Sequence, residues 1–153
     1  NPKLLPDRTL DPFSYVNGHF YPLKNAKLSH GWKYIKNWKP ADKVSTRSGF
    51  ADVPILEASR PGAMMKLKFS GKAIGVFVTS GPDAGIIEYS IDGFDFKTVD
   101  QFTQWSTQLH LPWLIMLDDE LQDGKHTMIL RIAKDKNPAS IGNVCRIHQF
   151  TVN

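Results

Sequence analysis

Residues Lys72–Asp100, KAIGVFVTSGPDAGIIEYSIDGFDFKTVD, contain the signals of three consecutive β-strands. Ile74–Thr79 is apolar on both faces, as in a central strand that is covered on both sides. Asp92-Gly93 then separates two alternating segments, and this pair between alternating apolar residues is a strong signal for a two-residue β-hairpin turn. The segment therefore predicts a central strand followed by a hairpin.

The two-residue turn also predicts how the strands on either side of it pair. Counting outward from the turn places Tyr89 opposite Phe96 and Glu88 opposite Lys97. The first pair is aromatic and the second is oppositely charged, and both kinds of cross-strand pair stabilise antiparallel sheets. We therefore expect one register that satisfies both faces of the hairpin.

Short strands recur along the rest of the chain. The other predicted strands are Lys27–Ile35, Ile55–Ser59, Met64–Ser70, Leu109–Leu117, His126–Ile132 and Val144–Val152. Their spacing is typical of an all-β sandwich, and no window has a convincing helical period. In the last strand the apolar positions change parity between Ile147 and Phe150, which predicts a bulge. The predicted fold is all-β: a two-sheet antiparallel β-sandwich of the jelly-roll type.

The N-terminal part of the chain differs from the rest. Prolines are frequent before the Asn17-Gly18 turn, so residues 1–24 are predicted to form a linker or an extended segment, and residues 25–153 the β-sandwich domain. The chain starts at Asn1 without a methionine or a signal peptide, which we interpret as the start of a processed or excised fragment.

The composition is that of an ordinary globular domain. The chain has 153 residues, of which 41% are hydrophobic and 22% charged, and its net charge is +4. No apolar run approaches the ~20 residues needed to span a membrane. A mild excess of lysine between Lys24 and Lys43 could attract an acidic glycan or a phosphate backbone, or could simply be a solvated surface. The single cysteine, Cys145, cannot form an internal disulfide and is expected in the core.

No catalytic residue is predicted. Asp123 and His126 have the Asp-x-x-His spacing that supplies the acid and the base in SGNH (GDSL-type) esterases, where a serine elsewhere is the nucleophile. The chain has no Gly-Asp-Ser block to supply that serine, and a triad requires all its members together. The spacing is therefore interpreted as a turn before a strand.

Metal sites have weak support as well. The five histidines do not have the spacing of zinc ligands. Asp83 or Asp118 could help loop carbonyls to hold Ca²⁺, but hard cations need several oxygen ligands and the EF-hand pattern is absent. We therefore predict no metal site and no cofactor, while Ca²⁺ binding stays an open alternative.

Four residues are candidates for ligand binding: Trp105, His110, Asp83 and Arg60. Aromatic faces stack on sugar rings and neighbouring polar groups bind hydroxyls, so Trp105 in a polar loop and His110 after it suit a carbohydrate. Asp83 and Arg60 lie near predicted strand ends, where functional loops gather. The alternatives are that Trp105 caps the end of the sandwich, that the nearby Trp113 belongs to the core, and that the charged residues are structural.

Several motifs carry a resemblance to a known family. They are Phe69-Ser70-Gly71-Lys72-Ala73-Ile74-Gly75, Gly81-Pro82-Asp83-Ala84-Gly85, Ile87-Glu88-Tyr89-Ser90-Ile91-Asp92-Gly93, Leu109-His110-Leu111-Pro112 and Leu121-Gln122-Asp123-Gly124-Lys125-His126-Thr127. With these motifs, residues 32–152 resemble the jelly-roll, galactose-binding-like accessory domain of SGNH/GDSL-type hydrolases of Bacteroidetes. The resemblance implies a secreted, periplasmic or cell-surface bacterial protein whose catalytic SGNH domain precedes this one. By analogy the parent reaction would be deacylation of a glycan.

Four functional hypotheses follow. The first is a non-catalytic accessory domain that binds carbohydrate or supports a neighbouring SGNH catalytic domain. The second is a structural module without a ligand, which an exposed apolar patch around Phe13, Tyr15 and Phe20 would favour. A free-standing enzyme is disfavoured by the missing nucleophile block, and nucleic-acid binding by the weak, scattered positive charge.

Overall fold

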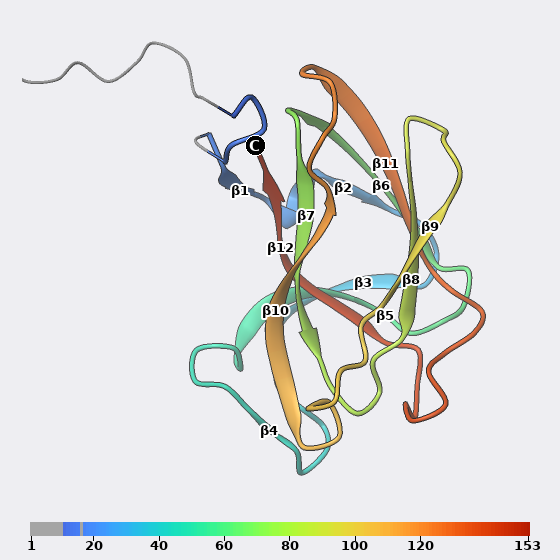
Figure 1. Ribbon diagram of the computed structural model, residues 1–153. Coiled ribbons are helices and arrows are strands. Elements are labelled where there is room, and N and C mark those ends of the chain that lie inside the picture. The colour runs from blue at the N-terminus through green and yellow to red at the C-terminus, as the bar shows by residue number, and fades with distance from the viewer. Residues whose placement is uncertain (1–10, 16) are drawn as a thin grey trace, which may run out of the picture.

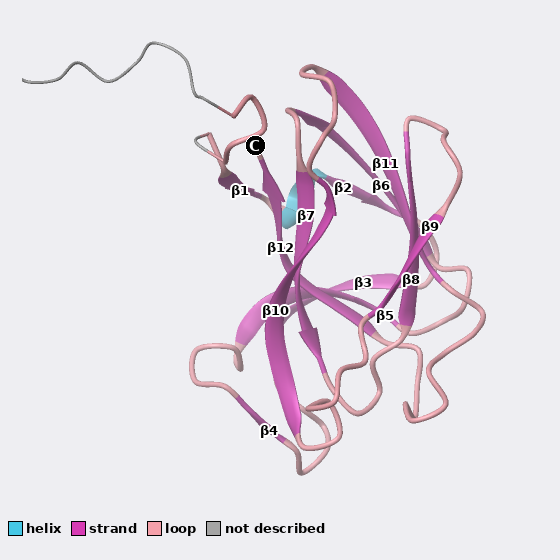
Figure 2. Cartoon of the chain, in the orientation of Figure 1, coloured by secondary structure: helices cyan, strands magenta, loops and turns pink. Residues whose placement is uncertain are grey.

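The computed structural model describes residues 11–15 and 17–153, and within them it contains twelve β-strands and one short 3₁₀ turn (Figures 1 and 2). The elements are β1 (His19–Tyr21), η1 (Leu23–Asn25), β2 (Ala26–Leu28), β3 (Trp32–Trp38), β4 (Ser45–Thr46), β5 (Val53–Ala58), β6 (Met64–Ser70), β7 (Ile74–Ser80), β8 (Ile86–Ile91), β9 (Lys97–Asp100), β10 (Leu109–Asp118), β11 (Lys125–Ile132) and β12 (Cys145–Val152).

The strands form two sheets that pack face to face as a jelly-roll sandwich. The seven-stranded sheet has the order β3-β5-β12-β7-β10-β4, with β1 also paired to β12, and the five-stranded sheet has the order β2-β6-β11-β8-β9. All pairs are antiparallel except the short pair between β4 and β10. The predicted fold class is therefore confirmed.

Alternating apolar residues explain why the core lies between these sheets. In β6, Met65, Leu67 and Phe69 are buried, while the lysines between them are exposed. Strand β7 is buried at almost every position, because it lies between β12 and β10 inside the seven-stranded sheet. The bulge predicted in the last strand is present in β12, where the register with β7 shifts between Ile147 and Gln149.

The hairpin turn is as predicted, but the register beyond it is not. Asp92 and Gly93 both have positive φ, 55° and 79°, as a type I′ turn requires. Beyond the turn, however, Tyr89 pairs with Lys97 rather than with Phe96. The strand that leaves the turn therefore contains one extra residue, and the expected pair of Glu88 with Lys97 is wrong.

A stronger partner for Glu88 accounts for this shift. Arg131 lies directly opposite Glu88 on β11, and its Nε donates a hydrogen bond of 2.6 Å to the Glu88 carboxylate. The Arg131 guanidinium also stacks 3.6 Å from the centre of the Phe96 ring. The extra residue brings Phe96 over this ion pair, whereas Lys97 approaches Asp118 at 4.0 Å.

The single strand predicted at Lys27–Ile35 is also wrong, because the chain forms two strands there. β2 belongs to the five-stranded sheet and β3 to the seven-stranded sheet, so the chain crosses between sheets at Ser29–Gly31. Gly31 has a φ of 102°, and the Ser29 hydroxyl donates to the carbonyl oxygen of Met64. A residue with a side chain is strained at that φ, so the glycine makes the crossing possible.

The loop between β3 and β5 covers part of the outer face of the seven-stranded sheet. Its Phe50 ring lies 5.6 Å from the rings of both Phe77 and His148. Its short strand β4 adds to β10. Leu114 and Met116 of β10, which share a pocket with residues of β1, stay exposed.

The N-terminal segment joins the sandwich through β1, which pairs with the end of β12. The boundary predicted at residues 24 and 25 stays a prediction. Of the expected linker or extended segment 1–24, residues 1–10 and 16 lie outside the described residues. The Asn17 amide and the Asn153 side chain, at 3.0 Å, add a further contact between the two segments. No helix in the described part of the chain is long and apolar enough to span a bilayer.

Candidate functional site

The loop 101–108 joins β9 to β10 and exposes Trp105 at one end of the sandwich. The Trp105 side chain is 56% exposed. Three polar residues around it, Gln104, Thr107 and Gln108, are exposed as well. An indole so far in solvent contributes little to the core and leaves an aromatic face beside amide and hydroxyl groups.

A buried polar network holds the base of this loop. The hydroxyls of Ser80 and Ser106 lie 2.8 Å apart, and Ser80 Oγ donates a hydrogen bond of 2.5 Å to the Gln101 carbonyl. The Gln101 side chain is fully buried, and its Nε2 donates to the Gly85 carbonyl at 3.0 Å. Buried polar groups that bind one another in this way fix a loop firmly. The position of Trp105 is therefore set by the sandwich end.

Asp83 is engaged in an ion pair inside the protein. Arg146 is 7% exposed and binds both Asp83 oxygens, at 2.9 and 2.6 Å, while its Nε donates to Glu57 at 3.2 Å. Burial alone would raise the pKa of Asp83, but the hydrogen bonds and charge of Arg146 outweigh it and hold that pKa below its usual value. In this structure Asp83 fastens the β7–β8 loop to β12.

His110 is buried in the same cluster. Its Nε2 lies 2.9 Å from an oxygen of Asp42, which belongs to the β3–β5 loop. The ring of Trp38 meets the His110 ring edge to face at 5.6 Å and lies 5.2 Å from the Arg146 guanidinium. Trp38 therefore connects His110 to the ion pair of Arg146 and Asp83.

The other candidate residues lie apart from this cluster. Arg60 follows β5 and donates from Nη1 to His30 Nε2 at 2.6 Å. Trp113 and His110 lie on opposite faces of β10. Trp113 packs against the core, as expected if it is a core residue and not a ligand contact. The four predicted residues share one end of the sandwich, where β5 and β7 end and β10 begins, but only Asp83 and His110 belong to one cluster.

The Asp-x-x-His motif does not form an acid–base pair. His126 binds Asp92 through Nδ1 at 2.5 Å and the Gln122 carbonyl through Nε2 at 2.6 Å. Burial alone would lower the pKa of His126, but the contacts with Asp92 and Gln122 raise it above its usual value. Both ring nitrogens are therefore occupied, and Asp123 is not a partner of the ring.

The acidic residues considered for Ca²⁺ have other partners. Asp83 binds Arg146, while Asp118 lies 4.0 Å from Lys97 and accepts a hydrogen bond from the Glu120 amide. Among the described residues, no three His, Cys, Asp or Glu side chains are grouped so that they could hold a metal ion.

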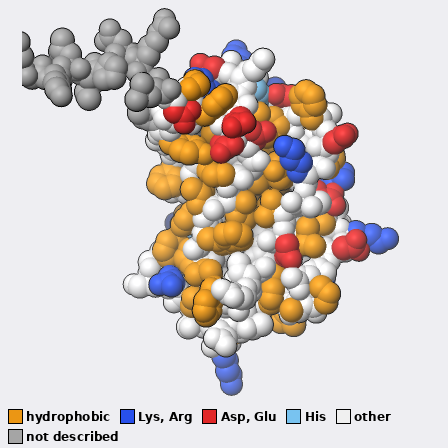
Figure 3. Space-filling model, in the orientation of Figure 1, with side chains coloured by type: hydrophobic (Ala, Val, Ile, Leu, Met, Phe, Trp, Pro, Cys, Tyr) orange, Lys and Arg blue, Asp and Glu red, His pale blue; other side chains and the backbone are white. Residues whose placement is uncertain are grey.

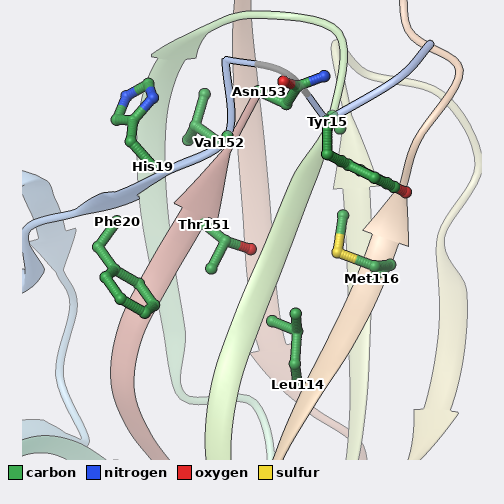
Figure 4. A pocket seen from close by; sticks show the side chains of 10 residues that line it. Tyr15, His19, Phe20, Leu114, Met116, Thr151, Val152 and Asn153 are labelled. Carbon is green, nitrogen blue, oxygen red and sulfur yellow. The ribbon is translucent and has the colours of Figure 1, made fainter.

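An apolar pocket lies at the opposite end of the molecule, beside β1 (Figure 4). It has a volume of about 410 Å³ and is lined by Tyr15 and Phe20 of the N-terminal segment and by Leu114 and Met116 of β10. Tyr15 is 52% exposed and Phe20 64%. Hydrophobic side chains continue from this pocket down the face shown in Figure 3.

Acidic groups lie beside the same pocket. The Tyr15 hydroxyl donates to Asp119 at 3.3 Å. Partial burial raises the pKa of Tyr15, and the negative charges of Asp119 and Asp11 raise it further. All three residues of the expected apolar patch, Phe13, Tyr15 and Phe20, are exposed, and Tyr15 and Phe20 line the pocket. Asp119 lies at its edge.

The contacts that organise these sites have no local signal in the sequence. Asp42 and His110 are separated by 68 positions, and Arg146 and Asp83 by 63. Only the topology of the sandwich brings them together. Trp105, by contrast, was identified because a large aromatic residue in a polar loop is unusual.

Comparisons with known proteins support the fold. No family model and no curated protein matches the chain. A solved structure of a two-domain esterase (CEX) active on acetylated mannans is similar over 98% of this chain, with a TM-score of 0.65 and 15% identity. A xanthan lyase from Paenibacillus matches 88% of the chain, with a TM-score of 0.59 and 13% identity. An exo-β-1,3-galactanase from Phanerochaete chrysosporium matches 89%, with a TM-score of 0.57 and 13% identity.

Each of these proteins is much longer than the present chain. The chain spans 40% of the esterase, 13% of the lyase and 29% of the galactanase. At these identities the likeness establishes the architecture alone. The chain therefore shares its β-sandwich fold with parts of several carbohydrate-active enzymes.

Proposed function

We propose that this chain is a non-catalytic accessory domain of a secreted SGNH/GDSL-type esterase of bacterial origin, and that it binds carbohydrate at the sandwich end that carries Trp105. The observation that carries the proposal is the exposed indole of Trp105 on a loop held by buried hydrogen bonds. A loop whose backbone is already held loses little conformational entropy when a ligand stacks on its aromatic residue. The architecture shared with carbohydrate-active enzymes, and the resemblance to SGNH accessory domains, favour a sugar as that ligand.

The surroundings of Trp105 suit a sugar ring. Gln104, Thr107 and Gln108 offer amide and hydroxyl groups that can bind sugar hydroxyls. His110 is buried and Asp83 is half-buried with both carboxylate oxygens bound to Arg146, so we assign them to support of the loops rather than to direct contact.

Two of the five histidines, His126 and His148, are unsuited to act as a general base. His126 has both ring nitrogens occupied. His148 binds Thr79, and its burial lowers its pKa to about 4, far from the range of a general base at neutral pH. Ester hydrolysis by the isolated chain would contradict the non-catalytic assignment.

Retention on immobilised plant and host polysaccharides tests the proposal. The wild-type chain should be retained on at least one neutral glycan, and Trp105→Ala should lose that retention. Tyr34→Ala is the matched control, because Tyr34 is an aromatic residue of similar exposure, 57%, on β3. A chain that no glycan retains, or equal losses in both variants, would overturn the carbohydrate assignment.

A structural interdomain role is the second candidate, and the apolar pocket beside β1 favours it. Its lining residues Phe20, Leu114 and Met116 are more exposed than large apolar side chains usually are. In this case Leu114→Ser would weaken association with a neighbouring catalytic domain without changing glycan retention. Co-purification of the two separately expressed domains would measure that effect.

A further inference from the structure

The outer face of the five-stranded sheet carries lysines that oppose one another. Lys27 on β2 pairs directly with Lys66 on β6, and Lys68 follows two positions later on the same face. Lys125 on β11 lies opposite Ser70, diagonally across from Lys68. We call these four residues the lysine strip; all of them are exposed.

No carboxylate neutralises the lysine strip within residues 11–15 and 17–153. The acidic residue on the neighbouring part of this face, Glu88, is bound to Arg131. The lysines that do form ion pairs, Lys33 and Lys97, lie elsewhere, with Glu57 and Asp118. Like charges directly opposite one another destabilise a sheet, so the strip contributes nothing favourable to folding.

A groove adjoins one end of the lysine strip. It has a volume of about 730 Å³ and lies between β1 and the β6–β11 pair, where Lys68 and Lys125 line it together with Tyr21, Ser70 and Thr127. The Tyr21 hydroxyl donates to the Lys68 carbonyl at 3.1 Å. His126 also lines it, but its ring nitrogens are bound to Asp92 and to the Gln122 carbonyl. The groove thus combines positive charge with hydrogen-bonding groups.

We propose that the lysine strip and this groove bind an anionic glycan, a polysaccharide whose sugars carry carboxylate or sulfate groups. The positive charge and the absence of acidic partners indicate an anionic ligand. The choice of a glycan among polyanions rests on the proposed function, and the hydroxyl groups in the groove suit sugar rings. The strip runs across β2, β6 and β11, so an extended chain could contact several of its lysines.

This site is separate from the Trp105 site. Lys125 begins β11, whereas the other end of β11, at Ile132, pairs with Ile87 next to the end that carries Trp105. The groove therefore lies at the end of the strands opposite to Trp105, and the strip extends from it as far as Lys66, which pairs with Ile129 in the middle of β11. Each can therefore be lost without the other.

Affinity measurements on polygalacturonate and dextran sulfate, with a neutral galactomannan beside them, test the proposal. Replacing Lys27, Lys66 and Lys68 with Gln should weaken binding to at least one acidic polymer about ten-fold, as expected for three exposed charged contacts. Weaker binding to polygalacturonate would indicate that the site prefers carboxylate groups, and weaker binding to dextran sulfate would indicate sulfate groups. Binding should also fall steeply as NaCl rises toward 1 M, because salt screens exposed charges.

The matched control replaces Lys36, Lys39 and Lys43 with Gln. These lysines are also exposed, and their loss lowers the net charge by the same amount. They belong to the lysine excess between Lys24 and Lys43, so the control also tests that segment as the alternative site. If the lysine strip is the site, the control should bind the acidic polymer within two-fold of wild type. Equal weakening in both triple variants would overturn the proposal in favour of a net-charge effect. Tighter binding to single-stranded DNA through the same three lysines would also overturn it, in favour of a nucleic-acid ligand.

Trp105→Ala distinguishes anionic-glycan binding at the lysine strip from carbohydrate binding at Trp105. The variant should lose retention on the neutral glycan and keep its affinity for the acidic polymer. Loss of both in Trp105→Ala would show that the lysine strip is not an independent site. Unchanged thermal midpoints in the lysine variants would confirm that lost binding is not lost folding.

Discussion

At the scale of single residues, Asp92 shows how one side chain does several tasks. It occupies the positive-φ position of the hairpin turn, binds the ring of His126 and accepts a hydrogen bond of 2.8 Å from the Thr127 amide. The hydrogen bond with His126 holds the pKa of Asp92 below its usual value. The turn of one hairpin is thereby fastened to the start of β11.

We predict that Asp92→Ala lowers the free energy of unfolding by about 1–2 kcal/mol, because both hydrogen bonds are lost and alanine is disfavoured at positive φ. Urea denaturation near pH 6 measures the change. Asp92→Asn is the control: asparagine tolerates this φ, so it should retain more stability than alanine. Equal stability of Asp92→Ala and wild type would contradict the role assigned to this side chain.

The same pair predicts a pH dependence. The raised pKa of His126 means that its contribution is fully present below about pH 6.5 and is lost as the pH rises through its folded-state value. The lowered pKa of Asp92 means that its contribution is present above about pH 3.9 and is lost as the pH falls through its own folded-state value. The stability difference between wild type and Asp92→Asn should therefore be largest between these limits.

At the scale of elements, the loop between β3 and β5 shields the outer face of the seven-stranded sheet. Phe50 covers His148, whose burial lowers its pKa to about 4. We predict that Phe50→Ala admits water and moves the pKa of His148 toward the ordinary value near 6.5. Titration of the His148 ring by NMR measures this shift. Phe94→Ala, which removes an exposed ring next to the hairpin turn of the other sheet, is a control that should leave it unchanged.

The elements also show what the sequence could predict. Strand β6 was predicted with its observed ends, because its alternation of apolar residues and lysines is local. The register of β9 was predicted incorrectly, because Glu88 binds Arg131, a residue 43 positions away on another strand. The division of Lys27–Ile35 between two sheets was missed for a similar reason: the carbonyl that anchors Ser29 belongs to Met64.

The candidate site also contains residues whose environment follows from nearby sequence and residues whose environment depends on distant segments. The exposure of Trp105 followed from its polar neighbours, whereas the burial of His110 depends on Asp42 and Trp38, which come from a distant loop. The lysine strip was visible as an alternating pattern within β6, but its like-charged neighbour Lys27 was recognisable only once β2 and β6 were paired.

At the scale of the whole molecule, Cys145 reports on global unfolding. Its side chain has no exposed surface, and burial raises the pKa of its thiol to about 12. It begins β12, which lies between β5 and β7 in the sheet. We predict no reaction of the native protein with a thiol reagent near neutral pH, and one equivalent after denaturation, because the thiolate is the reactive form. Rapid labelling under native conditions would show that this end of β12 opens locally.

Strand β1 is only three residues long, yet it covers the side of β12 at Phe150–Val152 that β5 does not reach. Without it, a row of peptide groups flanked by buried apolar side chains would face solvent. Such a row recruits strands from other molecules. The short β1 therefore protects the sandwich against self-association, and a chain shortened to begin at Pro22 would be prone to aggregate even though its core residues are intact.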